Sequence, residues 1–177
     1  RFLGKRGRQV RVYARGEGEE PVKSVKEKED LKSIGNSSTL PKDITDREEV
    51  KRWFYVLSES VAARLRDADV GKANTVHIVV RNEKLQDTTC QTKVSPTILC
   101  GDIAKAAYEL FCKHFPFGTR VRMLGVTVSG FDYHVEQMRL DAYMGGSNAS
   151  YEKKERAENA IAKLREKYGY ATVQRGL

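Results

Sequence analysis

The sequence predicts an α+β domain in which a four-stranded, antiparallel or mixed sheet has two helices on one face and an open opposite face. Four segments alternate between polar and apolar residues at the two-residue period of a strand. Two segments between them carry apolar residues at three- and four-residue spacing, which is typical of amphipathic helices. Their order along the chain is β-α-β-β-α-β, and two helices can cover only one face of such a sheet. An extra helix follows near the C-terminus.

The first element of the domain is a strand at residues 31–40, which we expect Pro41 to end. Before it, residues 1–15 hold six basic and no acidic residues, and residues 16–30 are a polar stretch without helical period. Thr45 and Glu48 have the spacing of a capping box that opens a helix to about residue 68. The apolar stripe of this helix is Val50, Phe54, Leu57, Val61 and Leu65.

The next two strands, at residues 75–82 and 87–94, are joined by a turn at Glu83 and Lys84 and form a hairpin or close antiparallel pair. A helix at about residues 102–115 and a strand at 120–131 follow. The helix buries Ile103, Ala107, Leu110 and Phe111. The last helix, at residues 151–168, is predicted to line up Ala157, Ile161, Leu164 and Tyr168.

The side chains of the open face follow from the two-residue period of each strand. On the second strand His77 and Arg81 lie opposite the apolar side chains, and on the fourth strand Met123, Gly125 and Thr127 do. Hydroxyls, amides, small residues and a few cations suit contact with phosphates, but an ordinary solvated sheet face has a similar composition. Stacking of single-stranded bases is disfavoured, because the outward positions of the third and fourth strands hold no Phe or Tyr.

The composition excludes several classes of function. Lys and Arg number 32 and Asp and Glu 24, and the net charge of +8 is compatible with a polyanionic partner without requiring one. Three cysteines without CxxC spacing predict reduced thiols and no zinc site. No apolar run approaches a membrane span, and no Walker loop, GxSxG or HExxH motif is present. We therefore expect no membrane association, no catalytic residue and no metal site in this chain.

Three separated motifs resemble the little-finger domain of Y-family (translesion) DNA polymerases. They are KSIGNSSTLP at residues 32–41 followed by TDREE at 45–49, TVHIVVR at 75–81, and RVRMLGVTVSG at 120–130. The first and the last match the opening and the final strand of that domain. Residues 7–22 are similar to the end of the thumb domain, and residues 160–176 to the C-terminal tail of some bacterial DNA polymerase IV-like proteins of the ImpB/MucB/SamB family.

The resemblance implies a division into a thumb remnant (1–22), a linker (23–30), a little finger (31–135), a tail (136–150) and a C-terminal helix with its own tail (151–177). It also implies that the open face grips the backbone of template–primer DNA. The contacts carried over position by position are Asn36, Ser37, Ser38, Thr39, Lys72, Thr89, Gln91, Lys93, Arg122, Thr127 and Ser129.

The segment EQMRLDAY at residues 136–143 is similar to the peptides by which bacterial polymerases bind the sliding clamp. Gln137, Met138 and Leu140 would be its anchors, with Tyr143 in the place of the usual aromatic residue. A plain polar connector remains the alternative reading of this segment.

The resemblance further implies a cytoplasmic parent polymerase that uses Mg²⁺ in a palm domain. We expect this chain to be a fragment without that palm and without nucleotidyl transfer of its own. The alternatives are a ferredoxin-like adaptor that binds proteins and not nucleic acid, and an enzyme in its own right.

Overall fold

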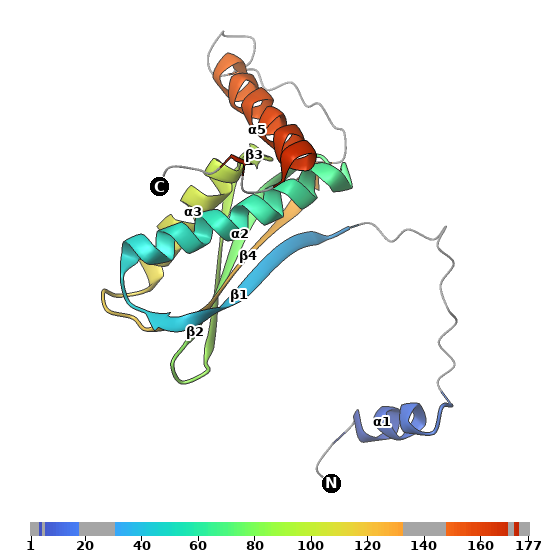
Figure 1. The fold of residues 1–177 in the computed structure, drawn as a ribbon. Helices are drawn as coiled ribbons and strands as arrows, with labels where there is room; N and C mark the ends of the chain where they lie inside the picture. Colours follow the sequence, from blue (N-terminus) through green and yellow to red (C-terminus); the bar gives the residue numbers. More distant parts are fainter. Residues whose placement is uncertain (1–3, 5, 18–30, 133–147, 170–171, 174–177) are drawn as a thin grey trace. The chain divides into compact units, whose positions relative to one another are not determined.

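The computed structural model describes residues 4, 6–17, 31–132, 148–169 and 172–173. The chain divides into two compact units, Arg1–Asp30 and Leu31–Leu177. In the first unit, helix α1 spans Arg6–Ala14 and has no buried residue. The second unit contains the sheet and helices α2, α3 and α5 (Figure 1).

The sheet of the second unit has four antiparallel strands in the order β1-β4-β2-β3. The strands are β1 (Ser33–Ile44), β2 (Lys72–Asn82), β3 (Asp87–Thr97) and β4 (Val121–Asp132). The predicted α+β class and the β-α-β-β-α-β order are confirmed. In this order β4 and β2 are the central strands, and β1 and β3 are the two edges. All three pairings are antiparallel.

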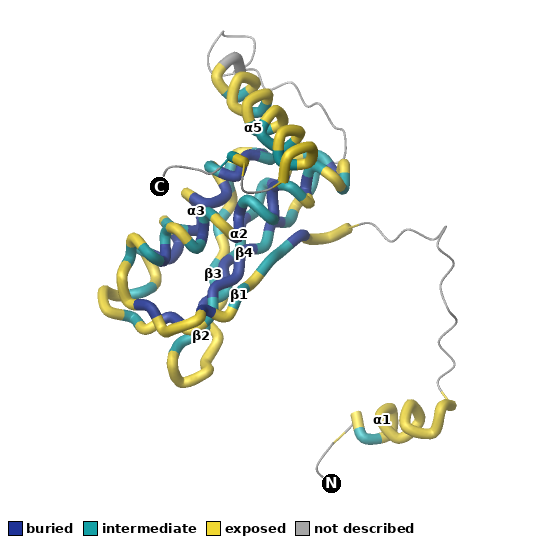
Figure 2. Tube along the Cα trace, viewed as in Figure 1, coloured by how far each residue is buried: buried dark blue, intermediate teal, exposed yellow. Residues whose placement is uncertain are grey.

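Helices α2 (Arg47–Ala68) and α3 (Cys100–His114) cover one face of the sheet, as predicted (Figure 1). Helix α2 packs on β1 and β4, and α3 packs on β2 and β3. The buried residues lie between the helices and the sheet (Figure 2). The ring of Phe54 meets that of Phe111 edge-on at 6.0 Å. The predicted stripes of both helices are buried: Val50, Phe54, Leu57, Val61, Leu65, Ile103, Ala107, Leu110 and Phe111.

Three predicted boundaries are wrong, for local reasons. Strand β1 runs on past Pro41, and β3 includes Pro96. Both strands are edges, where a residue without an N–H is tolerated, and β1 changes register between Thr39 and Ile44. Helix α2 is capped by Asp46 and not by Thr45, because the Asp46 carboxylate accepts hydrogen bonds from the backbone N–H groups of Glu48 and Glu49.

Helix α5 (Asn148–Tyr168) packs against α2 and the start of α3, within the same unit, through polar residues seven positions apart: Tyr151, Glu158 and Arg165. The apolar residues that line up on this helix do not form a buried face, because Leu164 and Tyr168 are 43% and 60% exposed. The docking contacts are Tyr151 with Ile98 N (3.1 Å), Glu158 with Cys100 N (3.1 Å) and Arg66 (3.1 Å), and Arg165 with Glu59 (2.9 Å).

Candidate nucleic-acid interface

The side of the sheet opposite α2 and α3, here called the open face, is not covered by any helix in the part of the second unit that the structure describes. The strand registers arrange its side chains in four rows that cross the sheet from β1 through β4 and β2 to β3. The rows are Ser33, Ser129, Thr75, Lys93; then Gly35, Thr127, His77, Gln91; then Ser37, Gly125, Val79, Thr89; and finally Thr39, Met123, Arg81, Asp87.

Two glycines, Gly35 and Gly125, lie in the middle rows of the open face, where side chains of neighbouring strands occupy the space that a Cβ atom would need. A Cβ atom at Gly35 would overlap the Thr127 hydroxyl, and one at Gly125 would lie 3.1 Å from Ser37 Cβ. Larger residues at these positions would displace their neighbours. The glycines therefore let the side chains of Thr127 and Ser37 pack closely against the neighbouring strand.

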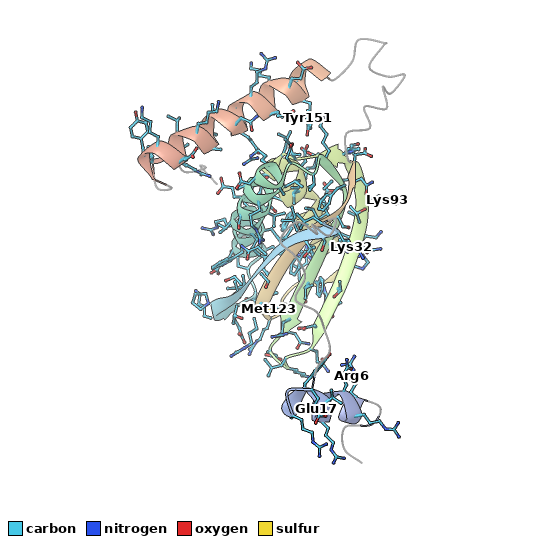
Figure 3. The ribbon with its side chains drawn as sticks, turned by 90° about the vertical axis from the view of Figure 1, so that its right-hand side faces the viewer. Arg6, Glu17, Lys32, Lys93, Met123 and Tyr151 are labelled. Atoms are coloured by element: carbon cyan, nitrogen blue, oxygen red, sulfur yellow. The ribbon has the colours of Figure 1, made fainter. Side chains whose placement is uncertain are left out.

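Side chains with hydroxyl groups, an imidazole and a lysine lie around these two glycines on the open face. His77 Nε2 and the Ser129 hydroxyl form a hydrogen bond of 2.8 Å between the neighbouring strands β2 and β4. Lys93 is exposed at the β3 edge, and none of the ion pairs among the described residues includes it. Lys93 and Lys32 lie toward one end of the sheet and Met123 toward the other (Figure 3). Such donors suit phosphate oxygens better than base edges.

Two shifted pKa values accompany this arrangement. A two-pronged hydrogen bond from Arg81 lowers the pKa of Asp87, so this carboxyl group stays ionised on the open face. At the other end of the sheet, burial raises the pKa of the Tyr151 hydroxyl, whose ring lies 4.5 Å from Lys72 Nζ. Lys72 is thus held beside α5, at the margin of the open face.

Most of the predicted contact residues lie on the open face, and the structure brings them together. These residues are Ser37, Thr39, Thr89, Gln91, Lys93, Thr127 and Ser129. Their predicted role in DNA binding stays a prediction. Four further residues lie on the open face but were not among the predicted DNA contacts: Ser33, Thr75, His77 and Arg81. The alternation of β2 does predict that His77 and Arg81 lie on this face.

Two predicted positions on β1 face the wrong way. Asn36 and Ser38 share the helix-covered side with Ile34 and Leu40, and Asn36 Nδ2 donates a hydrogen bond to Ser60 of α2 (3.1 Å). The prediction that both belong to the open face is therefore wrong.

Arg122 lies where the register of β4 against β2 shifts, between Met123 and the buried Val121, so simple alternation does not assign its direction. It is exposed and reaches Asp43 at 3.4 Å, and its predicted role in DNA binding stays a prediction. The candidate clamp-binding residues Gln137, Met138, Leu140 and Tyr143 lie outside the described residues.

The described residues offer no group of three or more His, Cys, Asp or Glu side chains that could hold a metal ion. Within the same residues, no helix is both long and apolar enough to cross a membrane. The three cysteines, all within the described part, form no disulfide with one another.

Comparison with known proteins identifies the family. Residues 31–140 match the model of the "impB/mucB/samB family C-terminal domain". The chain is 35% identical to DNA polymerase IV of Acetivibrio thermocellus, over 100% of this chain and 44% of that protein. It is 33% identical to DNA polymerase IV 1 of Bacillus subtilis, over 99% of this chain and 42% of that protein. The chain therefore spans less than half the length of these relatives.

Among solved structures, one titled "Complex of beta-clamp processivity factor and little finger domain of PolIV" is similar with a TM-score of 0.48. It is 21% identical and covers 60% of this chain and 96% of that one. On the family match and the sequence relatives, this chain belongs to the impB/mucB/samB family and contains its C-terminal domain.

Proposed function

We propose that residues 31–132 form the DNA-gripping little finger of a cytoplasmic translesion DNA polymerase, with its open face laid against the backbone of template–primer duplex. The observation that supports this most is the open face itself, which bears hydroxyls and Lys93, a lysine in no ion pair of the described residues, and is covered by no helix among those residues. The relatives named DNA polymerase IV supply the enzyme to which such a domain would belong.

Nucleotide addition would be carried out by other parts of the parent protein. The described residues hold no group of three or more His, Cys, Asp or Glu side chains that could bind Mg²⁺, so the palm of the parent would supply this ion. The role proposed for this chain is to hold the duplex in place without reading its sequence.

The 177-residue chain is expected to bind a short primer–template duplex with an affinity that falls as salt rises. If Lys32, Lys72 and Lys93 neutralise about three phosphates, the affinity drops by about 40-fold between roughly 50 and 200 mM salt. Fluorescence anisotropy of a labelled duplex measures this. Equal affinity at both salt concentrations would exclude phosphate contacts.

Lys93→Ala locates the interface, with Lys105→Ala as its matched control. Lys93 lies on the open face, whereas Lys105 is an exposed lysine of α3, on the helix side of the sheet. The first variant should make the salt slope shallower by about 0.9, the share of one phosphate, and the second should leave it unchanged. Equal effects of both variants would indicate nonspecific attraction. An adaptor that binds only proteins would show no DNA affinity at all.

We also propose that residues 136–143 dock on the bacterial sliding clamp, on the strength of the sequence motif. Gln137→Ala combined with Leu140→Ala should abolish clamp binding in a pull-down or surface plasmon resonance assay and leave DNA affinity within about twofold, since apolar anchors dominate such peptides. Arg139→Ala, between the two anchors, is the control with little expected effect. Clamp binding that survives the double substitution would show that the motif is wrong.

A further inference from the structure

Three arginines gather at the end of the sheet where the β2–β3 hairpin turns, and each is paired with a carboxylate of another element or of the partner strand. Arg81 is the last residue but one of β2, while Arg120 and Arg122 flank the first residue of β4. We call these arginines and their partners the hairpin end. The pairs are Arg81 with Asp87 (2.6 and 2.7 Å), Arg120 with Glu83 (3.2 Å) and Arg122 with Asp43 (3.4 Å).

These ion pairs contribute little to the stability of the fold. The arginine side chains are 36%, 65% and 49% exposed and their partners 43%, 43% and 31%. In exposed pairs of this kind, solvent screens the attraction and ordering two side chains costs entropy, so little net stability results. Their main physical effect is on the charge of the surface, because each carboxylate cancels one arginine.

The cancellation falls on the surface proposed to bind phosphate. Asp87 and Arg81 occupy the last row of the open face, opposite each other on neighbouring strands. The planar guanidinium of Arg81 makes its two hydrogen bonds to Asp87 in the geometry with which arginine also binds a phosphate. At the other end of the face, Lys93 takes part in no ion pair of the described residues. The two ends of the sheet therefore offer a phosphate backbone different strengths of attraction.

We propose that the hairpin end is a latent phosphate-binding site, whose three arginines are neutralised by Asp43, Glu83 and Asp87 so that the domain holds duplex DNA loosely. This inference rests on the proposed function and adds a determinant of affinity to it. A phosphate reaching this end must displace a carboxylate from each arginine and tolerate its negative charge nearby. The three carboxylates thus restrict strong phosphate contacts to the end of the sheet that carries Lys93.

The test is a triple variant, Asp43→Asn with Glu83→Gln and Asp87→Asn, made in the 177-residue chain and titrated with the same duplex. The amides keep the shape of the side chains but release the arginines. We expect binding at least about tenfold tighter and a salt slope steeper by about 0.9 for each additional phosphate contacted.

A second triple variant controls for net charge. Glu48→Gln, Glu109→Gln and Glu152→Gln remove three carboxylates from ion pairs on α2, α3 and α5, away from the open face. Its net charge rises by the same amount, and its affinity should change by less than about threefold. Adding Arg81→Ala to the hairpin-end variant should reverse part of the gain.

The outcomes separate the two proposals. Salt-dependent binding by the natural chain, with no tightening in the hairpin-end variant, overturns the latent site and leaves the proposed function standing. Equal tightening in both triple variants also overturns it, because net charge alone would then account for the gain. If the natural chain and both variants fail to bind duplex, the proposed function and this inference both fall. Thermal unfolding within a few degrees of the natural chain confirms that the variants are folded.

Discussion

Thr127→Asp is expected to weaken duplex binding by about 100-fold. Thr127 lies on the central strand β4, between Gly35 of β1 and His77 of β2, in the middle of the open face. A phosphate laid against this area would come within roughly 6 Å of the new carboxylate, and two like charges at that distance repel by about 3 kcal/mol in a medium of surface-like polarity. Anisotropy titrations of the labelled duplex at low salt measure the loss.

Thr88→Asp is the matched control, because it makes the same chemical change on the other side of the sheet. Thr88 is an exposed residue of edge strand β3 and alternates with Thr89, which lies on the open face. We expect its affinity to fall by about twofold or less. A Thr127→Asp variant that binds like the natural chain would rule out the open face as the interface. Equal losses in both variants would mean that net charge alone decides binding.

The faces of β2 and β4 could be predicted from sequence because their apolar residues alternate with polar ones. Val76, Ile78 and Val80 are buried, and the residues between them point to the open face. In β1 only Ile34 and Leu40, six positions apart, mark the covered face, and residues 35–39 between them are glycine and polar residues, so the alternation is hard to see. Counted from these two residues, Asn36 and Ser38 lie on the covered face, and the hydrogen bond from Asn36 to Ser60 of α2 agrees with that direction.

Two further features lay beyond pattern reasoning for physical reasons. The ion pairs of the hairpin end join residues as far apart in sequence as Asp43 and Arg122, and no local period relates them. Helix α5 docks through a tyrosine and two charged residues, whereas sequence rules look for apolar stripes. The strand order was also not given by the element order, since it depends on which strands meet in space.

Docking of α5 supplies the start of α3 with a hydrogen-bond acceptor that α3 lacks locally. The N-cap residue, Leu99, makes no side-chain capping hydrogen bond. Instead Glu158 Oε2 accepts a hydrogen bond from the backbone N–H of Cys100 at 3.1 Å and one from Arg66 Nη1 at 3.1 Å. The side chains of Glu158 and Arg66 are only 12% and 19% exposed, so water replaces either contact poorly. A carboxylate at this position is also favoured by the dipole of α3.

Glu158→Ala is therefore expected to lower the free energy of unfolding by about 3 kcal/mol, of which about 1 comes from the lost cap and about 2 from the charged hydrogen bond to Arg66. Urea and thermal unfolding followed by circular dichroism measure it, and the melting temperature should fall by about 9 °C. Glu158→Gln keeps an acceptor for the Cys100 N–H and should lose about half as much.

Glu152→Ala, in the same helix, removes a carboxylate that is 56% exposed and pairs with Arg156 one turn away. This control should lose less than about 0.5 kcal/mol, because exposed pairs within a helix contribute little. If Glu158→Ala costs no more than this control, α5 does not cap α3. A loss confined to Glu158, with Glu158→Gln in between, would instead make α5 an integral part of the folded domain, since the first turn of α3 would depend on a side chain that lies 58 residues further along the chain.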